Sequence, residues 1–311
     1  MGGANNICSD KTGTLTLNKM TLTNIWNGNL KTIDTYEEKS DIKKYMNSDE
    51  LAELFVISSC VNSIANLRPE PKGSSTEIAM LNFMEKTGNT YESYRELYPT
   101  KLKYPFSSAR KRMSVVIDYK GENTLFVKGA SEMILACCSK WFNIATGKVE
   151  DITPHIKTEM EEAIVSMAEK SLRTLCFAYK RLSNDDNLEA KDDRGIFNVE
   201  KNDLIVIALL GVKDIARQEV PGAIAKCHKA GIKVRMVTGD NIITARAIAT
   251  EVGILKEGDG SLVMEGSEFI KIVGGVVCKK CQVAVCNCAK DSKQADETGE
   301  DIRVDTISNG E

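Results

Sequence analysis

The sequence predicts an α/β fold in which one parallel sheet is interrupted by an inserted α+β region. Residues 204–210 form a continuous apolar run, which is the signature of a strand covered on both faces. Helix, strand and helix follow in close succession, and Gly231 and Gly253 stand after the two predicted helices as C-terminal caps. A buried strand end at Ile7 and Cys8 is predicted to join the same Rossmann-like sheet, so this domain is expected to be discontinuous.

This pattern divides the chain into four segments. The discontinuous domain is predicted at 1–24 and, in incomplete form, at 203–272; the α+β domain occupies 25–202, and a flexible Cys-rich, acidic insertion occupies 273–311. Within 25–202 the predicted helices are 51–64, 76–86, 131–140 and 155–170, and the predicted strands are 113–119, 124–128 and 174–180. Polar residues 120–123 are predicted to join the first two of these strands as a hairpin.

Composition narrows the class of protein. The chain has 311 residues, of which 42% are hydrophobic and 27% charged, as in an ordinary globular protein. A net charge of −3 is not the electrostatic footprint of a nucleic-acid-binding protein. The longest apolar run, 204–212, is too short to cross a bilayer as a helix. Six cysteines lie within apolar elements and are predicted to be free, buried thiols in a reducing cytosol: Cys8, Cys60, Cys137, Cys138, Cys176 and Cys227.

The most informative part of the sequence is the loop after the first predicted strand. It begins with a carboxylate, Asp10, and continues Lys-Thr-Gly-Thr-Leu-Thr. Backbone N–H groups and hydroxyls of such a loop can converge on one small anion beside the carboxylate. A carboxylate in that setting suits a nucleophile that accepts a phosphoryl group. The alternative is an Asp that only caps a turn.

The run from Asp10 resembles the phosphorylation motif of P-type ATPases, and its flanks, 1–6 and 17–21, are most similar to those of plasma-membrane-type calcium pumps. The resemblance implies a haloacid-dehalogenase-like phosphorylation domain that holds a nucleotide-binding domain. It implies that Asp10 attacks Mg-ATP to form an aspartyl phosphate, that Thr12 and Thr238 orient the phosphoryl group, and that Asp10 and Thr12 lie at the Mg²⁺. The transported ion would be calcium, carried by a membrane domain absent from these residues. Met1 is then expected to be an internal residue of a longer membrane protein.

One position separates this pump chemistry from that of a phosphatase. Haloacid-dehalogenase-like phosphatases carry a second Asp two residues after the nucleophile, where this chain has Thr12. Loss of a general acid–base costs about 100- to 10,000-fold in rate, which favours a long-lived phosphoenzyme over rapid hydrolysis. The family's later Gly-Asp-Gly-x-Asn-Asp loop is absent from the sequence. We therefore expect ATP binding with little autophosphorylation, and a non-catalytic ATP-binding or regulatory part remains an alternative.

Three positions of 25–202 match the family's adenosine-binding pattern. Phe106 would stack on adenine, with a core position as its alternative. Lys128 ends a hydrophobic strand and would attract a phosphate, while Gly129 beside it would let a ligand approach the backbone. Glu77 matches an adenine-contacting Glu, but Ser74 and Glu77 also form a Ser-x-x-Glu capping box.

Two further cations match the nucleotide pattern, Lys111 and Arg173. Lys111 lies between Arg110 and Arg112, and three consecutive cations are typical of a solvated bend. The sequence therefore indicates no role for the two arginines. Calmodulin or any other regulator is not indicated by these residues either.

The second half of the chain contributes matches near the predicted parallel strands. Gly239 and Asp240 follow Thr238 and are assigned to the nucleotide together with Arg217. Asp214 matches the family's Asp-Pro-x-Arg hinge, although Ile215 replaces the proline. For Asp214 the alternative is a helix N-cap or loop carboxylate.

Four cysteines near the end of the chain form a separate cluster: Cys278, Cys281, Cys286 and Cys288. Four thiols can hold one Zn²⁺ tetrahedrally. The spacing between the two pairs is shorter than in ordinary zinc modules, so free or redox-active thiols are the alternative.

Overall fold

The computed structural model describes residues 3–35, 37–183, 185–239, 242–256, 258, 260–272, 276–277 and 305–306. The chain forms two units, Met1–Thr238 and Gly239–Glu311. Among the described residues, no helix is both long and apolar enough to span a bilayer.

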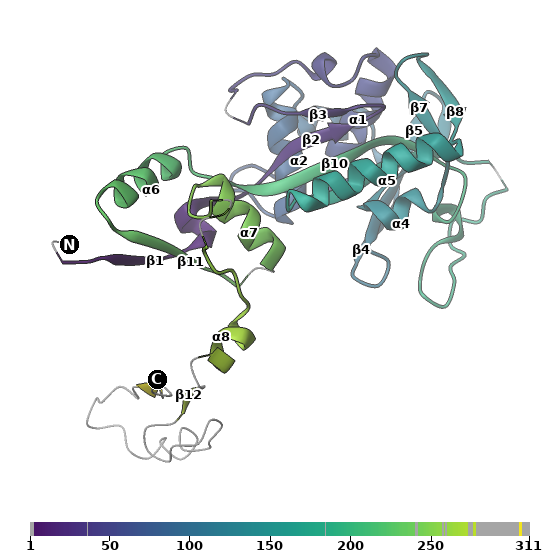
Figure 1. The fold of residues 1–311 in the computed structure, drawn as a ribbon. Coiled ribbons are helices and arrows are strands. Elements are labelled where there is room, and N and C mark those ends of the chain that lie inside the picture. Colours follow the sequence, from purple (N-terminus) through teal and green to yellow (C-terminus); the bar gives the residue numbers. More distant parts are fainter. Residues whose placement is uncertain are drawn as a thin grey trace, which may run out of the picture. The chain divides into compact units, whose positions relative to one another are not determined.

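A nine-stranded sheet forms the centre of the first unit, and most of its strand pairs are antiparallel (Figure 1). The order is β3-β2-β10-β9-β6-β5-β4, with β7 beside β10 and β8 beside β7. The strands are β2 (Thr16–Trp26), β3 (Leu30–Thr32), β4 (Thr100–Ser107), β5 (Arg112–Tyr119), β6 (Glu122–Ala130), β7 (Cys138–Asn143), β8 (Lys148–Asp151), β9 (Arg173–Arg181) and β10 (Leu204–Ala216). β2 and β10 come from distant parts of the chain, and they lie side by side in the sheet (Figure 1).

The apolar run at 204–210 forms a strand as predicted, but its neighbours differ from the prediction. β10 runs antiparallel to both β2 and β9, and only its first residues pair in parallel with β7. A strand is apolar throughout whenever both of its faces are covered, whichever way its neighbours run. The assignment of this run to the parallel sheet was therefore wrong.

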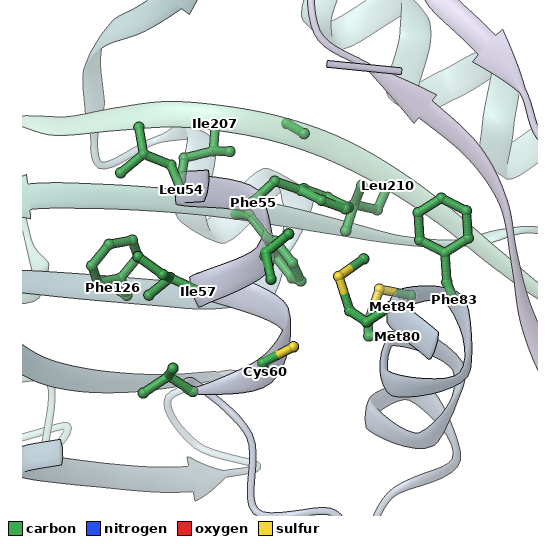
Figure 2. Packing of buried hydrophobic residues seen from close by; sticks show 14 of the residues in the cluster. Leu54, Phe55, Ile57, Cys60, Met80, Phe83, Met84, Phe126, Ile207 and Leu210 are labelled. Carbon is green, nitrogen blue, oxygen red and sulfur yellow. The ribbon is translucent and has the colours of Figure 1, made fainter. Parts of the chain in front are cut away.

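Helices cover both faces of the large sheet. On one face lie α1 (Asp49–Cys60), α2 (Ser75–Lys86) and α3 (Tyr91–Leu97); α4 (Ser131–Leu135) and α5 (Pro154–Glu169) belong to the other core cluster. Figure 2 shows Phe55 of α1 and Met80 of α2 packed with Phe126 of β6 and Leu210 of β10. Val127, the next residue of β6, lies in the opposite cluster, as the strand period of two requires.

The local predictions for residues 25–202 are mostly confirmed. The helices predicted at 51–64, 76–86 and 155–170 correspond to α1, α2 and α5. The hairpin prediction is confirmed by β5 and β6, whose two turn residues Lys120 and Gly121 both have positive φ, as a two-residue hairpin turn requires. The helix predicted at 131–140 is wrong beyond residue 135, because Cys138 already begins β7 and pairs with β10.

A second, two-stranded sheet carries the start of the chain. β1 (Asn6–Asp10) pairs in parallel with β11 (Lys233–Val237), and α6 (Val220–Lys229) precedes β11. This confirms the prediction that the strand at Ile7 and Cys8 shares a parallel sheet with the strand between the two capped helices. The prediction that Cys8 is buried is wrong, because among the described strands β1 has only β11 as a neighbour and its faces stay accessible.

Of the other cysteines predicted to be buried, only some are. Cys60 and Cys176 are buried in the large sheet's two cores, whereas Cys137, Cys138 and Cys227 are half-buried.

The second unit contains α7 (Ile242–Glu251), α8 (Gly266–Ile272) and the short pair β12 (Val276–Val277) and β13 (Asp305–Thr306). The predicted glycine caps are confirmed: Gly231 after α6 and Gly253 after α7 have φ of 73° and 82°. Two short helical turns, η2 (Ile42–Lys44) and η3 (Asn198–Glu200), and the loop η1 (Lys11–Leu15) complete the described elements.

Candidate functional site

Four strand ends meet at one end of the large sheet. Ser107 of β4 lies opposite Arg112 of β5, Arg112 lies opposite Gly129 of β6, and Gly129 lies opposite Cys176 of β9. We call this end of the sheet the loop end. It carries four of the predicted nucleotide residues, Phe106, Lys111, Lys128 and Arg173.

The fifth predicted residue, Glu77, comes from the first turn of α2. Its carboxylate Oε1 lies 2.5 Å from Nζ of Lys128, and the two side chains are only 9% and 13% exposed. Burial lowers the pKa of Lys128 from its usual value, and the Glu77 carboxylate opposes that shift. A helix start and a sheet end are thereby joined by one buried ion pair.

The capping alternative for Glu77 is only half realised. Ser74 Oγ accepts a hydrogen bond of 3.3 Å from the Glu77 backbone N–H, so Ser74 is the N-cap of α2. The Glu77 carboxylate binds Lys128 instead of completing the box. Its second oxygen, Oε2, is buried and finds no hydrogen-bond partner among the described residues. A buried carboxylate oxygen without a donor is costly, and a ligand donor would satisfy it.

Phe106 and Lys111 lie at the surface of the loop end. Phe106 is 59% exposed, which excludes the core position that was its alternative. Lys111 is exposed and has a φ of 51°, and its backbone N–H donates to Ser107 O over 2.8 Å. The structure thus presents an aromatic face and a cation from the same turn.

Arg173 lies at the first position of β9 and reaches the start of α2. Its Nη1 donates to Thr76 Oγ1 over 3.2 Å, and the side chain is exposed. The contact places a guanidinium beside the helix turn that holds Glu77.

Gly129 does not leave room for a ligand. A Cβ at this position would lie 2.5 Å from Lys111 O and 3.0 Å from the Arg112 Cα. The missing side chain instead allows the turn to pack against β6, where Ala130 N–H donates to Lys111 O over 3.1 Å. The predicted role of Gly129 in ligand approach is therefore wrong.

The solvated bend predicted at 110–112 is wrong for both arginines. Arg110 and Arg112 are 5% and 2% exposed, and Arg110 forms a buried ion pair with Glu200. Sequence reasoning missed this cluster because the carboxylate lies 90 residues further along the chain. A signal was present in β5, where Arg112 and Ser114 occupy alternate positions of a strand and therefore share one face.

The second group of predicted residues lies at the β1–β11 pair. Asp10 is the last residue of β1 and lies opposite Val237, the last residue of β11, so Thr238 follows at the same strand end. Asp10 and Thr12 are exposed, and Gly13 takes a φ of 77°, which turns the chain back sharply.

Two residues of the Asp-Ile-Ala-Arg run bind the Asp10 loop and the start of β2. The Asp214 carboxylate accepts from Thr16 Oγ1 over 2.5 Å and from Lys19 N–H over 3.0 Å. The Arg217 guanidinium donates to Gly13 O over 2.9 Å and to Thr14 O over 3.2 Å. Asp214 lies within β10, so it is not a helix N-cap, and Arg217 binds the loop backbone although the sequence assigned it to the nucleotide.

The remaining predicted residues lie in the second unit or outside the described residues. Gly239 begins the second unit, and Asp240 lies outside the described residues. The four cysteines of the predicted zinc site also lie outside them. Within the described part of the chain, no cluster of three or more metal-binding side chains is present.

Comparison with known proteins decides the family. A model of the family described as P-type ATPase, cytoplasmic domain N, matches residues 50–219. The chain belongs to the P-type ATPase family. The match begins in α1 and ends just after β10, so it covers every strand of the large sheet except β2 and β3.

Several calcium-transporting members of the P-type ATPases are similar to this chain. Calcium-transporting ATPase PAT1 of Dictyostelium discoideum is 40% identical over 271 residues, which is 86% of this chain and 23% of that protein. Plasma membrane calcium-transporting ATPase 3 of Homo sapiens is 38% identical over 284 residues, which is 86% of this chain and 22% of that protein. Calcium-transporting ATPase 1 of Lactococcus lactis is 35% identical over 266 residues, which is 84% of this chain and 28% of that protein. The chain thus spans about a quarter of the length of these P-type ATPases.

Proposed function

We propose that this chain is the ATP-binding and phosphorylation part of a calcium-transporting P-type ATPase. The observation that carries the proposal is the convergence of Glu77, Phe106, Lys111, Lys128 and Arg173 at the loop end of the large sheet. An exposed aromatic ring and several cations at one site suit a ligand with a base at one end and phosphates at the other.

Each residue has a role that follows from its place. Phe106 offers an exposed face for stacking on the base, which contributes about 1–3 kcal/mol per base. Lys111 and Arg173 are exposed cations that would bind phosphates. The Lys128 ammonium uses one of its three donors on Glu77, so the others could bind a ligand oxygen.

Phosphorylation is proposed at Asp10, in a haloacid-dehalogenase-like domain built on the β1–β11 pair. The carboxylate would attack the γ-phosphate, forming an acyl phosphate and releasing ADP. Thr12 and Thr238 would donate hydroxyl hydrogen bonds to the phosphoryl oxygens, since both stand at the same strand end as Asp10. Asp10 and Thr12 offer the hard oxygen ligands that Mg²⁺ prefers, and the ion would neutralise charge on the transferring phosphate.

Calcium as the transported ion rests on the names of the similar proteins. The human relative is named for the plasma membrane and the matching family model is described as a cytoplasmic domain, which together support a place for this part on the cytosolic face of a membrane in the whole protein. Within the chain, Thr12 disfavours a phosphatase, because that position lacks the second carboxylate.

Calorimetric titration of ATP into the 311-residue chain tests the nucleotide site. We expect saturable binding that weakens in Lys128→Ala and in Phe106→Ala, and that is unchanged in Lys148→Ala, a surface substitution on β8. Absence of binding by the folded wild-type chain would overturn the proposal.

Incubation with γ-labelled Mg-ATP tests the second step. We expect little or no hydroxylamine-sensitive phosphoenzyme from this chain, and any that forms must vanish in Asp10→Asn. Label that survives in Asp10→Asn would exclude Asp10 as the phosphorylated residue. ATP binding without phosphoenzyme is also what the second candidate, a non-catalytic nucleotide-binding part, would give.

A further inference from the structure

A buried ionic cluster lies directly beneath the turn that carries Lys111. The Glu200 side chain is fully buried, and its carboxylate receives Arg110 Nη1 at 2.9 Å and 3.1 Å, one distance to each oxygen. Ser114 Oγ and Phe197 N–H also donate to this carboxylate. Four hydrogen bonds therefore hold Glu200 in one position.

The other side of Arg110 binds β4 just before Phe106. Arg110 Nη2 donates to Pro105 O over 2.5 Å and to Tyr104 O over 3.2 Å. These are the two residues immediately before Phe106. The guanidinium thus links the Glu200 carboxylate to the backbone that aims the Phe106 ring.

Arg112, at the C-terminal end of the turn, also binds Glu200. Its Nη1 donates to the backbone carbonyl of Glu200 over 2.9 Å, and its Nε donates to Arg110 O over 3.3 Å. Lys111 lies between the two buried arginines and points outward, with a left-handed backbone that only a fixed turn would maintain. Both ends of the turn are therefore anchored on Glu200.

We propose that Glu200 is a positioning residue for nucleotide binding, acting through Arg110 and Arg112 to present Phe106 and Lys111 together. This inference rests on the proposed nucleotide site at the loop end. Phe106 is 59% exposed, so packing around its ring contributes little to its orientation, and the backbone must supply it. Arg110 and Arg112 also carry two positive charges against the one negative charge of Glu200, and the remaining positive charge favours phosphates.

Hydrogen exchange measured by mass spectrometry tests the anchoring without any nucleotide. In Glu200→Gln, we expect the amides of residues 107–112 to exchange faster than in the wild-type chain, while the core amides of α1 keep their protection. Lys111 N–H, which donates to Ser107 O, is the most direct reporter. Unchanged exchange across 107–112 would overturn the proposal.

Calorimetric ATP titration tests the positioning role. Glu200→Gln is expected to raise the ATP Kd about fivefold or more, the lower end of a lost stacking contact. The Lys111→Ala substitution should weaken binding in the wild-type background and have a smaller effect in the Glu200→Gln background, because the Arg110 anchor of the turn is already lost there, although the Arg112 contact to the Glu200 backbone remains. A merely structural carboxylate would leave the two effects additive.

Two further variants complete the experiment, one as an alternative to Glu200→Gln and one as a control. Arg110→Lys keeps the charge opposite Glu200 but loses the forked contacts to the Tyr104 and Pro105 carbonyls, so it should loosen 107–112 even where Glu200→Gln does not fold. Glu85→Gln removes one partner of an exposed ion pair with Arg68 and should change neither exchange at 107–112 nor the Kd. If the wild-type chain binds no ATP, the nucleotide site itself fails, and the exchange experiment still decides whether Glu200 anchors the turn.

Discussion

The two groups of candidate residues are held in place by different means. At the loop end, the side chains that anchor the turn are the buried ions Arg110, Arg112 and Glu200, and the sheet that carries the turn is covered on both faces. At the β1–β11 pair, burial alternates between exposed and half-buried along both strands. There Arg217 donates to the backbone of the Asp10 loop, and Asp214 accepts from Thr16 and Lys19 at the start of β2.

The comparison indicates how each region responds to change. Water does not reach a buried ion pair to replace a lost partner, so removing one member leaves a buried charge without compensation. A half-buried hydrogen bond to backbone is replaced in part by water. We therefore expect the loss of one buried partner at the loop end to lower the free energy of unfolding strongly. Loss of one partner of the Asp10 loop should lower it less.

The largest expected effect is that of Arg110→Ala. It leaves Glu200 buried without its guanidinium, so the free energy of unfolding should fall by about 3–5 kcal/mol. Urea denaturation followed by circular dichroism measures it. The control is Arg68→Ala, which breaks exposed pairs with Glu85 and Glu92 and should cost no more than about 1 kcal/mol. Equal losses in the two variants would remove the contrast between buried and exposed charges.

A smaller loss, about 1.5–3 kcal/mol in total, is expected for Asp214→Ala. Two hydrogen bonds to its carboxylate disappear, but one is only partly buried and the other is exposed, so water replaces part of what is lost. The amide of Lys19 should exchange faster, whereas those of 107–112 should not change. Slower or unchanged exchange at Lys19 would show that the carboxylate does not hold this segment.

Phe106→Ala should hardly change stability. The ring is 59% exposed, and a surface substitution usually stays within about 0.5 kcal/mol. ATP affinity should nevertheless fall, by the stacking contribution. A loss of stability comparable to that of Phe126→Ala, a fully buried ring, would place Phe106 in the core instead.

Thiol labelling distinguishes the regions without changing stability. Burial raises the pKa of Cys60 to about 12, and Cys8 is exposed. Because the thiolate is the reactive form, iodoacetamide at pH 8 should modify Cys8 in the folded chain and spare Cys60. Retaining this thiol proton stabilises the fold below pH 9, and that contribution declines between pH 9 and about 12, as the unfolded chain ionises Cys60 first. Peptide mapping reads the labelling, and early modification of Cys60 would indicate local opening of α1.

The sequence alone determined the features that depend on neighbouring residues. It placed the β5–β6 hairpin, α1, α2 and α5, and the glycine caps after α6 and α7, because periodicity and turn chemistry are local. The motif at Asp10 identified the family that the match over 50–219 shows. The parallel pairing of β1 with β11 could also be predicted from the sequence, because both strands were assigned to one parallel sheet.

Only the tertiary structure decided which distant groups meet. An apolar run such as β10 reports that both faces are covered, but the direction of its neighbours depends on segments far away in the chain. The burial of Arg110 required Glu200, 90 residues later, and the exposure of Cys8 followed from how few strands flank β1 among the described residues. Burial and charge pairing are sums over three-dimensional neighbours, so a one-dimensional pattern does not contain them.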